Sequence, residues 1–525
     1  MSNFAPRFRG IILAGALAVM AAVSLPGSAA LAGDFMDTRL TWSFGDDDLM
    51  ANAGQVIPDS PITGIGDRPG YEMFMDNLNS RTSGRENLTH LVLYKEMPGF
   101  LKGLTTEAAL VMRLDMGALT EGNNPGVDDV LQDDGSYLRA AYTWDTQNPQ
   151  DKYLALTLFP FSTERFRLGY LYDISWGGGN IFTNNGSGLA PGLRLDVHSK
   201  MKKVTIDAFA GFKTAKVKQV VQEGSQEVEQ ISVKETNYGV LGGIGVDLYD
   251  WVRLDLGAGY FQQGTFERTS LMVGQPVWSA GLSARVTVRQ GLPIQSSVDF
   301  KLYRNHPDIN VADWWKEQYT PKKFSWSVSG EFSYAWQQLE SIEQYAETSL
   351  QPAWAGAAQV NFKYDYMRIQ IIGLIRNLEF ILLNVPSLTP FVAIPENGVS
   401  TTPEYFLAAT LDYRFDSLHL TPFITGGVQM PATFVTDSPY TVQVIRDETR
   451  RDRLPEGYEA LPIGQLRAGV QWEMSDFFSL IGAFQYVRDD NQTRLEYDSS
   501  GQRVVGRQFL DPNKFGFNIM VMARF

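Results

Sequence analysis

The sequence predicts an all-β protein, a transmembrane antiparallel up-and-down β-barrel of about 18 strands, with roughly 16 to 20 left open. Three observations predict this fold. The chain begins with a segment typical of a secretory leader, its body repeats a period-two alternation of apolar and polar residues, and its last strand ends on an aromatic residue. Together they describe an exported chain whose strands present one face to lipid and the other to water.

Residues 1–32 have the parts of a signal peptide. Arg7 and Arg9 give a positive start, residues 11–23 form an apolar stretch, and residues 30–32 (Ala-Leu-Ala) match the small-x-small pattern of a cleavage site. A retained anchor is disfavoured because the apolar run is shorter than the about 20 residues that a spanning helix needs. We expect cleavage after Ala32.

The remaining chain has no helical route through a bilayer. Its longest apolar runs are short pieces such as residues 371–375, far below the length of a spanning helix. The mean hydropathy of -0.17 does not exclude a membrane protein, because only alternate residues of a barrel strand face lipid.

Composition excludes several classes of function. The chain has no cysteine, which removes disulfides, thiol catalysis and cysteine-ligated metals. Its formal charge of -14 becomes -16 when Arg7 and Arg9 are cleaved off, whereas a nucleic-acid-binding protein needs a basic face. With 12% aromatic residues and 48 glycines, the chain is also unlike a disordered acidic tail.

The alternation is the main evidence for strands, since apolar residues recur at every second position over about 10 residues, the length of a tilted membrane strand. Only residues 339–350 suggest a helical period. The alternating segments are residues 107–116, 138–145, 166–174, 204–213, 252–260, 278–289, 324–336, 354–364, 405–415, 418–430, 466–472 and 478–486.

The two faces of these strands predict which side meets lipid. The apolar face carries no charge, and the opposite face carries glycine, arginine and aspartate, which suits a wet lumen. A soluble barrel of this size would need its apolar face inside and could not fill it with side chains. Aromatic residues recur near strand ends, as girdles at the membrane interfaces would: Trp144, Trp176, Tyr260, Trp278, Trp336, Tyr413 and Trp472.

Short connections alternate with long ones, as in bacterial outer-membrane barrels. The short ones are residues 145–152, 249–250, 289–295, 416–417 and 475–476; the long ones are residues 117–136, 177–192, 214–236, 262–275, 304–323, 384–403, 431–462 and 489–513.

The count of strands is uncertain at one place, because the parity is consistent only if residues 378–382 form an extra strand or another segment is misassigned. We assign residues 87–525 to the barrel. Residues 33–86 are a periplasmic extension, a plug or a first hairpin, with a possible strand at Leu40, Trp42 and Phe44.

The C-terminal strand is the most specific single signal. Its aromatic and aliphatic residues share one face, and the chain stops on an aromatic residue; we assign an assembly signal to Phe515, Phe517, Ile519, Val521 and Phe525. With the leader and the repeated strands, this resembles Gram-negative outer-membrane β-barrel proteins of porin-like size, in no identified subfamily. The resemblance implies location in the bacterial outer membrane and recognition by the barrel-assembly machinery.

No catalytic, cofactor-binding or metal-binding constellation is present. His198 shares a strand face with Asp196, but no nucleophile accompanies the pair, so a solvated lumen residue is the preferred interpretation. The acidic run at residues 46–48 lacks the spaced ligands of a calcium loop. We therefore expect no enzyme activity, no cofactor and no metal.

The polar face supplies the candidate site, a lumen lined by charges of both signs. Basic and acidic residues often stand two apart on one strand, so they could tie strands together or form the transverse field of a constriction. The lumen-lining candidates are Arg113, Asp115, Arg139, Asp173, Arg194, Asp196, Arg253, Asp255, Arg285, Arg289, Asp299 and Lys301.

Three functions follow from this reading. The first is a porin-like channel for passive passage of small polar solutes, in which inward-folded loops set the size limit. The alternative is a structural or docking barrel of a multiprotein envelope assembly with an occluded lumen, contacting partners through residues 214–236 and 431–462. An enzyme is the least favoured. The expected partners are outer-membrane lipid and the assembly machinery, with self-association or envelope proteins left open, and no nucleic acid.

Overall fold

The structure is a computed structural model. It describes residues 37–46, 49, 85–98, 100–115, 130–133, 136–145, 147–148, 151–163, 166–169, 174–177, 191–223, 229–266, 274–292, 323–341, 343, 347–382, 393–437, 439–445, 451–475, 477–497 and 504–524. Among these residues, no helix is long and apolar enough to cross a membrane.

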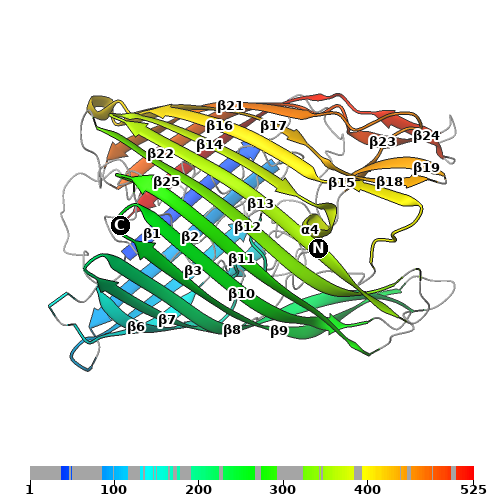
Figure 1. The fold of residues 1–525 in the computed structure, drawn as a ribbon. Coiled ribbons are helices and arrows are strands. Elements are labelled where there is room, and N and C mark those ends of the chain that lie inside the picture. The colour runs from blue at the N-terminus through cyan, green and yellow to red at the C-terminus, as the bar shows by residue number, and fades with distance from the viewer. Residues whose placement is uncertain are drawn as a thin grey trace, which may run out of the picture.

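The chain folds into one antiparallel barrel of eighteen long strands (Figure 1). A nineteenth strand of the sheet, β4 (Leu131–Asp133), has only three residues and pairs with β3. The long strands are β1 (Asp37–Asp46), β2 (Arg85–Pro98), β3 (Leu104–Asp115), β5 (Tyr137–Thr143), β6 (Lys152–Phe159), β7 (Gly192–Met201), β8 (Val204–Glu223), β9 (Glu229–Leu248), β10 (Val252–Thr265), β11 (Pro276–Gln290), β12 (Phe324–Glu340), β13 (Thr348–Tyr364), β14 (Met367–Arg376), β16 (Glu404–Tyr413), β17 (Leu420–Met430), β21 (Ile463–Ser475), β22 (Phe478–Arg488) and β25 (Asn513–Arg524).

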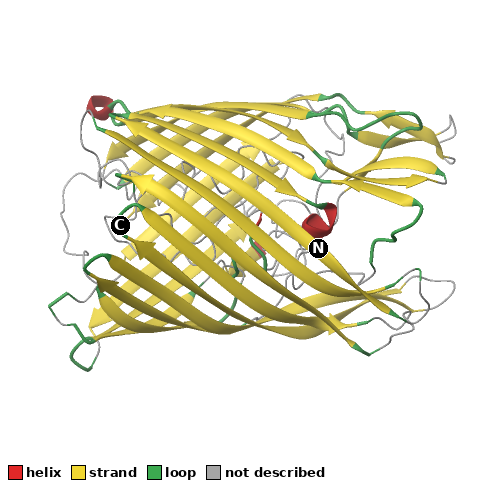
Figure 2. Ribbon diagram, viewed as in Figure 1, coloured by secondary structure: helices red, strands yellow, loops and turns green. Residues whose placement is uncertain are grey.

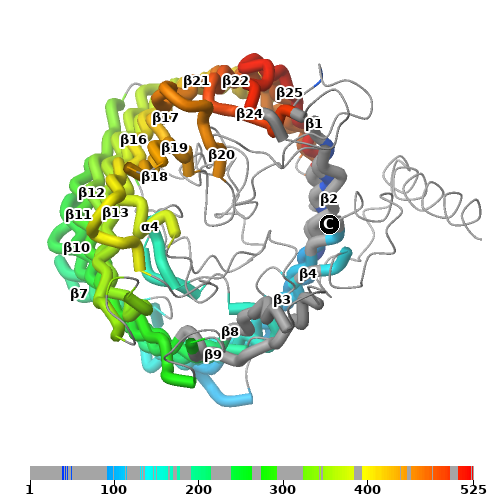
Figure 3. The backbone as a smooth tube through the Cα atoms, turned by 90° about the vertical axis from the view of Figure 1, so that its right-hand side faces the viewer, coloured from blue at the N-terminus to red at the C-terminus, as the bar shows by residue number. Residues whose placement is uncertain are grey.

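Each long strand pairs with the next along the chain, and β1 pairs with both β2 and β25. The pairing of β1 with β25 runs from Arg39 opposite Arg524 to Asp46 opposite Phe517, and it joins the last strand to the first. In the view along the barrel, the strands form a ring (Figure 3).

The alternation in the sequence explains why these segments are strands of a membrane barrel. On β16 every second residue is buried, and the residues between them are exposed. The exposed set includes Tyr405, Leu407 and Leu411, whereas the buried set includes Thr410 and Asp412. Apolar side chains therefore face outward and polar ones inward, the reverse of a soluble protein and the arrangement that a bilayer favours.

The two ends of the barrel differ. At one end short turns join β7 to β8, β9 to β10, β13 to β14, β16 to β17 through the 3-10 helix η4 (Asp416–Leu418), and β21 to β22. Tyr249, Asp365 and His419 adopt positive φ in these turns, a backbone conformation that lets two strands reverse within a few residues. By the rule that periplasmic turns are short, we assign this end to the periplasm.

The opposite end carries connections that form two small sheets of their own (Figure 2). One small sheet consists of β15 (Val399–Thr402), β18 (Ala432–Asp437), β19 (Tyr440–Ile445) and β20 (Arg451–Arg453), and another of β23 (Thr493–Tyr497) and β24 (Val504–Phe509). Thr493 of β23 connects them, because its hydroxyl donates a hydrogen bond to the carbonyl of Arg453 in β20 at 2.8 Å.

The structure corrects the prediction for residues 166–174, because the described residues of this range, 166–169 and 174, do not form a barrel strand. Leu168 instead pairs with Trp176 through two backbone hydrogen bonds of 2.9 Å, in a connection between β6 and β7. Phe166, Leu168 and Ile174 are fully buried. An alternating apolar pattern is the same whether its apolar face meets lipid or packs inside the lumen, which is why the sequence pattern was misleading here.

The extra strand considered at residues 378–382 is also wrong, because this segment is the short helix α4 (Leu378–Leu382). The Asn377 side-chain oxygen accepts a hydrogen bond from the Phe380 backbone N–H at 3.0 Å and thereby caps the start of the helix. In Figure 3 this helix lies inside the ring of strands. Neither residues 378–382 nor the described part of residues 166–174 adds a strand to the barrel. The number of long strands is therefore even, and the inconsistency in the predicted strand count disappears.

Two further predictions are corrected. The helical period at residues 339–350 does not give a helix, since β12 continues to Glu340 and β13 begins at Thr348. The connection expected at residues 214–236 is mostly strand, because β8 and β9 stay paired from Val204 opposite Leu248 to Glu223 opposite Glu229. A polar sequence does not distinguish a loop from a hairpin that extends beyond the membrane into water.

Candidate functional site

The inner wall of the barrel is the candidate site. Its first feature is the segment that joins β6 to β7, of which residues 160–163, 166–169 and 174–177 are described; we call them the inward segment. Its apolar side chains belong to one buried cluster with inward-facing residues of the strands, among them Phe159, Leu241 and Phe261. Trp176 packs edge-on against Phe261, with the ring centroids 5.4 Å apart. The segment therefore lies against the inside of the wall.

Glycines on the inner wall make room for the inward segment. A Cβ on Gly257 would lie 2.9 Å from Leu168 Cδ2, and a Cβ on Gly281 would lie 2.5 Å from Trp176 Cζ2. Neither separation is possible for a real side chain. The glycines leave space on the inner face of β10 and β11, and Leu168 and Trp176 of the segment fill it.

Lys213 of β8 anchors the inward segment. Its ammonium donates hydrogen bonds to the backbone carbonyls of Thr163 at 2.7 Å, Phe166 at 2.5 Å and Gly177. The residue is almost completely buried, 1% exposed. A lysine ammonium has three donors. This one side chain therefore bonds Thr163 and Phe166 in the first part of the segment and Gly177 at the end of its described residues.

The second feature of the wall is a row of charges nearer the periplasmic end, formed by His198, Asp207, Arg253, Asp255 and Arg285; we call it the charge row. His198 Nδ1 lies 2.5 Å from Asp207 Oδ1, and Arg253 Nη1 donates to Asp207 Oδ2 at 2.7 Å. Arg253 Nε donates to Asp255 Oδ1 at 2.7 Å, and Arg285 Nε donates to Asp255 Oδ2 at 3.3 Å. The ion pairs run continuously from β7 to β11.

Gly245 allows this row to cross β9. Asp207, Gly245 and Asp255 stand in one register row on β8, β9 and β10. A Cβ on Gly245 would collide with the Arg253 guanidinium and would lie 2.5 Å from Asp255 Oδ1. Arg253 therefore reaches over the glycine backbone to Asp207.

Gly245→Leu is expected to break the Arg253–Asp207 ion pair and to lower the stability of the barrel by about 1–3 kcal/mol, the cost of overpacking plus a disrupted charge network. Thermal unfolding in detergent, followed by circular dichroism, measures this. Gly464→Leu is the matched control, because a Cβ on Gly464 has no neighbour within 4 Å. Equal unfolding temperatures for the two variants would contradict the role of Gly245.

Further ion pairs continue around the wall. Arg139 donates to Glu107 at 2.6 Å, and its guanidinium lies 5.3 Å from the ring centroid of Tyr153, which in turn stacks on His198 at 5.0 Å. Arg194 donates to Asp196 at 2.8 Å and lies 4.2 Å from the ring of Phe209.

The far side of the barrel has pairs of its own. Arg368 donates to Asp412 at 2.8 Å, and Arg376 donates to Glu404 at 2.5 Å. Arg414 makes a bidentate pair with Glu473, with both distances 2.8 Å. Two of these pairs join β14 to β16, and the third joins Arg414, just after β16, to β21, so the pairs cross-link the wall.

Seven of the predicted lumen residues are described with their side chains, and all seven belong to the polar inner face. Arg194, Asp196, Arg253, Asp255 and Arg285 lie on neighbouring strands from β7 to β11, whereas Arg139 lies on β5 and Arg289 bonds the carbonyl of Leu292 at 2.9 Å. Asp173, Asp299 and Lys301 lie outside the described residues, as do the side chains of Arg113 and Asp115. That these residues contact solute stays a prediction.

Sequence reasoning missed two residues that organise the wall. Lys213 lies in period two with Asp207 and Gly211, so the pattern placed it on the polar face but could not show that it binds loop carbonyls. Glu107, the partner of Arg139, comes from a distant part of the chain. Only the register of β3 with β5, which sets Glu107 opposite Arg139, brings them together.

The terminal strand β25 lies beside β1 and β22. Phe515 and Ile519 are exposed on the outer face, while Phe517 and Val521 are half-buried. Phe525 lies outside the described residues. Recognition of this strand by an assembly machinery stays a prediction.

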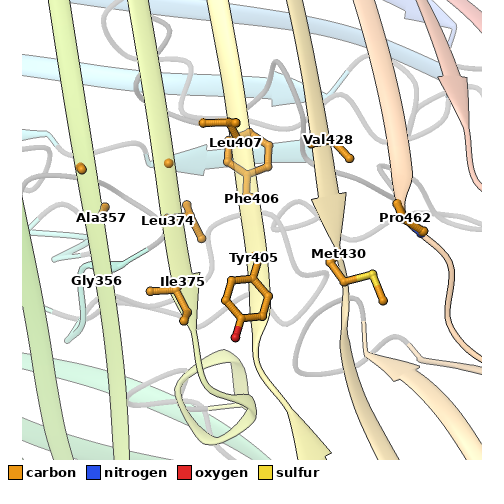
Figure 4. Close-up of a pocket in the computed structure, with 12 residues that line it drawn as sticks. Gly356, Ala357, Leu374, Ile375, Tyr405, Phe406, Leu407, Val428, Met430 and Pro462 are labelled. Carbon is orange, nitrogen blue, oxygen red and sulfur yellow. The ribbon is translucent and has the colours of Figure 1, made fainter.

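The outer wall carries an apolar groove across β13, β14, β16 and β17 (Figure 4). Its lining includes Gly356, Ala358 and Gly373, together with Tyr405 and Leu407. The backbone pairing of β13 with β14 and of β14 with β16 is uninterrupted here. The groove is thus a depression in the lipid-facing surface and not an opening through the wall.

Glu379 in α4 lies outside the membrane-spanning strands, and burial raises its pKa above the ordinary value, which is about 4.3. A raised pKa means that the folded helix favours the neutral carboxyl. Its contribution to stability is therefore fully present below pH about 4 and is lost as the pH rises through the raised pKa.

Glu379→Gln is consequently expected to slow amide hydrogen exchange in residues 377–382 at pH 7 and to leave it unchanged at pH 4, where the wild-type carboxyl is already neutral. Exchange followed by mass spectrometry at the two pH values measures this. Glu347→Gln, at an exposed position, is the control. Faster exchange in Glu379→Gln than in wild type at pH 7 would show that the carboxylate stabilises the helix.

Among the described residues, no group of three or more histidine, aspartate or glutamate side chains is placed to hold a metal ion.

The comparison with solved structures finds outer-membrane proteins of Gram-negative bacteria. Pseudomonas aeruginosa OccK3 (OpdO) matches with a TM-score of 0.41 and 9% identity over 93% of this chain and 95% of that chain. Acinetobacter baumannii OccAB3 matches with a TM-score of 0.44 and 9% identity over 93% and 99%. Pseudomonas aeruginosa OpdK, solved with vanillate, matches with a TM-score of 0.41 and 8% identity over 93% and 98%. No family model and no curated protein matches the chain.

Proposed function

We propose that this chain is a porin-like channel of the bacterial outer membrane that lets small polar solutes pass by diffusion. The observation that carries the proposal is the reversal of polarity between the two faces of the barrel. Leucines of β6 such as Leu154 and Leu156 are exposed on the outside, whereas ion pairs such as Arg253–Asp255 line the inside. A barrel of this width encloses more space than its own side chains fill.

The inward segment gives the proposed channel its size limit. It lies inside the wall of β8 to β11 and is fixed there by Lys213 and by rings seated over glycines. A clamped segment narrows the lumen by a constant amount, so the channel discriminates solutes by size. No residue needs to make or break a covalent bond for this function, and we propose no enzyme activity.

Liposome swelling with neutral solutes of increasing size tests the proposal. Purified mature protein is refolded into lipid vesicles, and the rate of swelling is followed by light scattering. We expect rapid entry of the smallest solutes and a steep fall in rate with solute size. Entry rates equal to those of protein-free vesicles, from protein shown to be folded by its strand signal in circular dichroism, would contradict the proposal.

A further inference from the structure

The charges of the inner wall differ in how far they reach the lumen. In the charge row, the side chain of Asp207 is 37% exposed. Its partners are more buried, at 11% for Arg253 and 18% for His198, and Asp255 and Arg285 are 4% exposed. Asp207 is thus the most exposed residue of the charge row.

Asp247 adds a second carboxylate at the same place. Its Oδ2 accepts a hydrogen bond of 3.3 Å from Arg253 Nη1, the atom that also donates to Asp207, and its side chain is 16% exposed. Two carboxylates therefore share one guanidinium that lies deeper in the wall. Of these three groups, Asp207 presents the most side-chain surface to the lumen, and the Arg253 guanidinium presents the least.

Position along the barrel puts these carboxylates beyond the inward segment. Asp207 and Lys213 share the inner face of β8, six residues apart, which is about 20 Å along a strand. Asp207 is close to the short turn between β7 and β8. A solute that has passed the inward segment meets this carboxylate before it reaches the periplasm.

We propose that Asp207, assisted by Asp247, determines the charge selectivity of the channel and makes it prefer cations. The inference rests on the proposed channel function. A small ion in the lumen approaches the exposed carboxylate oxygens more closely than the buried guanidiniums, and Coulomb energy in a wet pore falls with distance. Solutes that carry an ammonium or guanidinium group would accordingly pass faster than anions of the same size.

The test is the reversal potential of the protein in a planar bilayer between unequal concentrations of KCl. We expect wild type to favour K⁺ over Cl⁻. Asp207→Asn should reduce the K⁺ to Cl⁻ permeability ratio by about five-fold, the enrichment that one unit charge gives at about 4 Å in water. Asparagine keeps one oxygen that accepts from Arg253, and its amide N–H can donate to His198 Nδ1, so the row can stay bonded. Asp247→Asn should give a smaller reduction.

Asp437→Asn is the matched control, because it removes one carboxylate at an exposed position of β18, outside the barrel wall. It should leave the ratio unchanged. Anion preference in wild type, or an unchanged ratio in Asp207→Asn, would overturn the inference and leave the channel intact. Absence of any current from folded protein would overturn the proposed function, and the inference with it.

Discussion

Lys213→Met is expected to release the inward segment from the wall. Methionine fills the space of the lysine stem but cannot donate, so the carbonyls of Thr163, Phe166 and Gly177 lose their bonds to the ammonium. A hydrogen bond to a charged group contributes about 1.5–3 kcal/mol, and each buried carbonyl left without a donor costs about 1–3 kcal/mol. That loss shifts the equilibrium from the docked segment toward the released segment by a factor of about a hundred or more.

Two measurements follow this release. Hydrogen exchange in residues 166–177 should become about a hundred-fold faster, because the backbone bonds between Leu168 and Trp176 open more often. Single-channel conductance should rise, because the segment no longer narrows the lumen at a fixed position. Lys200→Met is the control. The Lys200 side chain is near the turn end of β7 and is 61% exposed, and its ammonium lies 3.6 Å from the Asp151 carboxylate. Unchanged exchange in Lys213→Met would refute the anchor.

Gly257→Phe is expected to act in the opposite direction. The benzyl group occupies the hollow that Leu168 fills, since a Cβ alone would already lie 2.9 Å from Leu168 Cδ2. Overpacking of this kind costs about 1–3 kcal/mol. With Lys213 still in place, the segment should be pushed off the wall toward the barrel axis. Conductance and the swelling rate with the larger solutes should therefore fall.

Gly330→Phe provides the control for this change. Gly330 lies on the outer, exposed face of β12, and a Cβ there has no neighbour within 4 Å. The same substitution at this position adds apolar surface to the lipid side and should leave conductance unchanged. If Gly257→Phe conducted like Gly330→Phe, the inward segment would not be what limits flow.

The fold could be predicted from the sequence to a large extent, because period two is a property of each strand by itself. β10 and β16 were recognisable from their own residues. The eighteen long strands agree with the predicted number, although residues 166–174 were predicted as a strand and residues 378–382 were considered as an extra one. Residues 166–174 and 378–382 have the apolar content of a strand, and only their packing inside the barrel shows that they are not part of the wall.

The site was less predictable for the same reason. Alternation assigns Arg253 and Asp255 to one face of β10, where the structure pairs them. It could not reveal that Arg253 reaches Asp207 across Gly245, because this depends on the register of three strands. The anchoring by Lys213 was equally hidden, since backbone carbonyls of a connecting segment have no signature in sequence.

The central claim is that the barrel is an open channel, and single-channel recording of the refolded mature protein in a planar bilayer tests it most directly. We predict stable current steps that are linear in voltage and grow with salt concentration, with a larger step for Lys213→Met and a smaller one for Gly257→Phe. Protein shown to be folded and inserted that gives no steps at any voltage would contradict the claim.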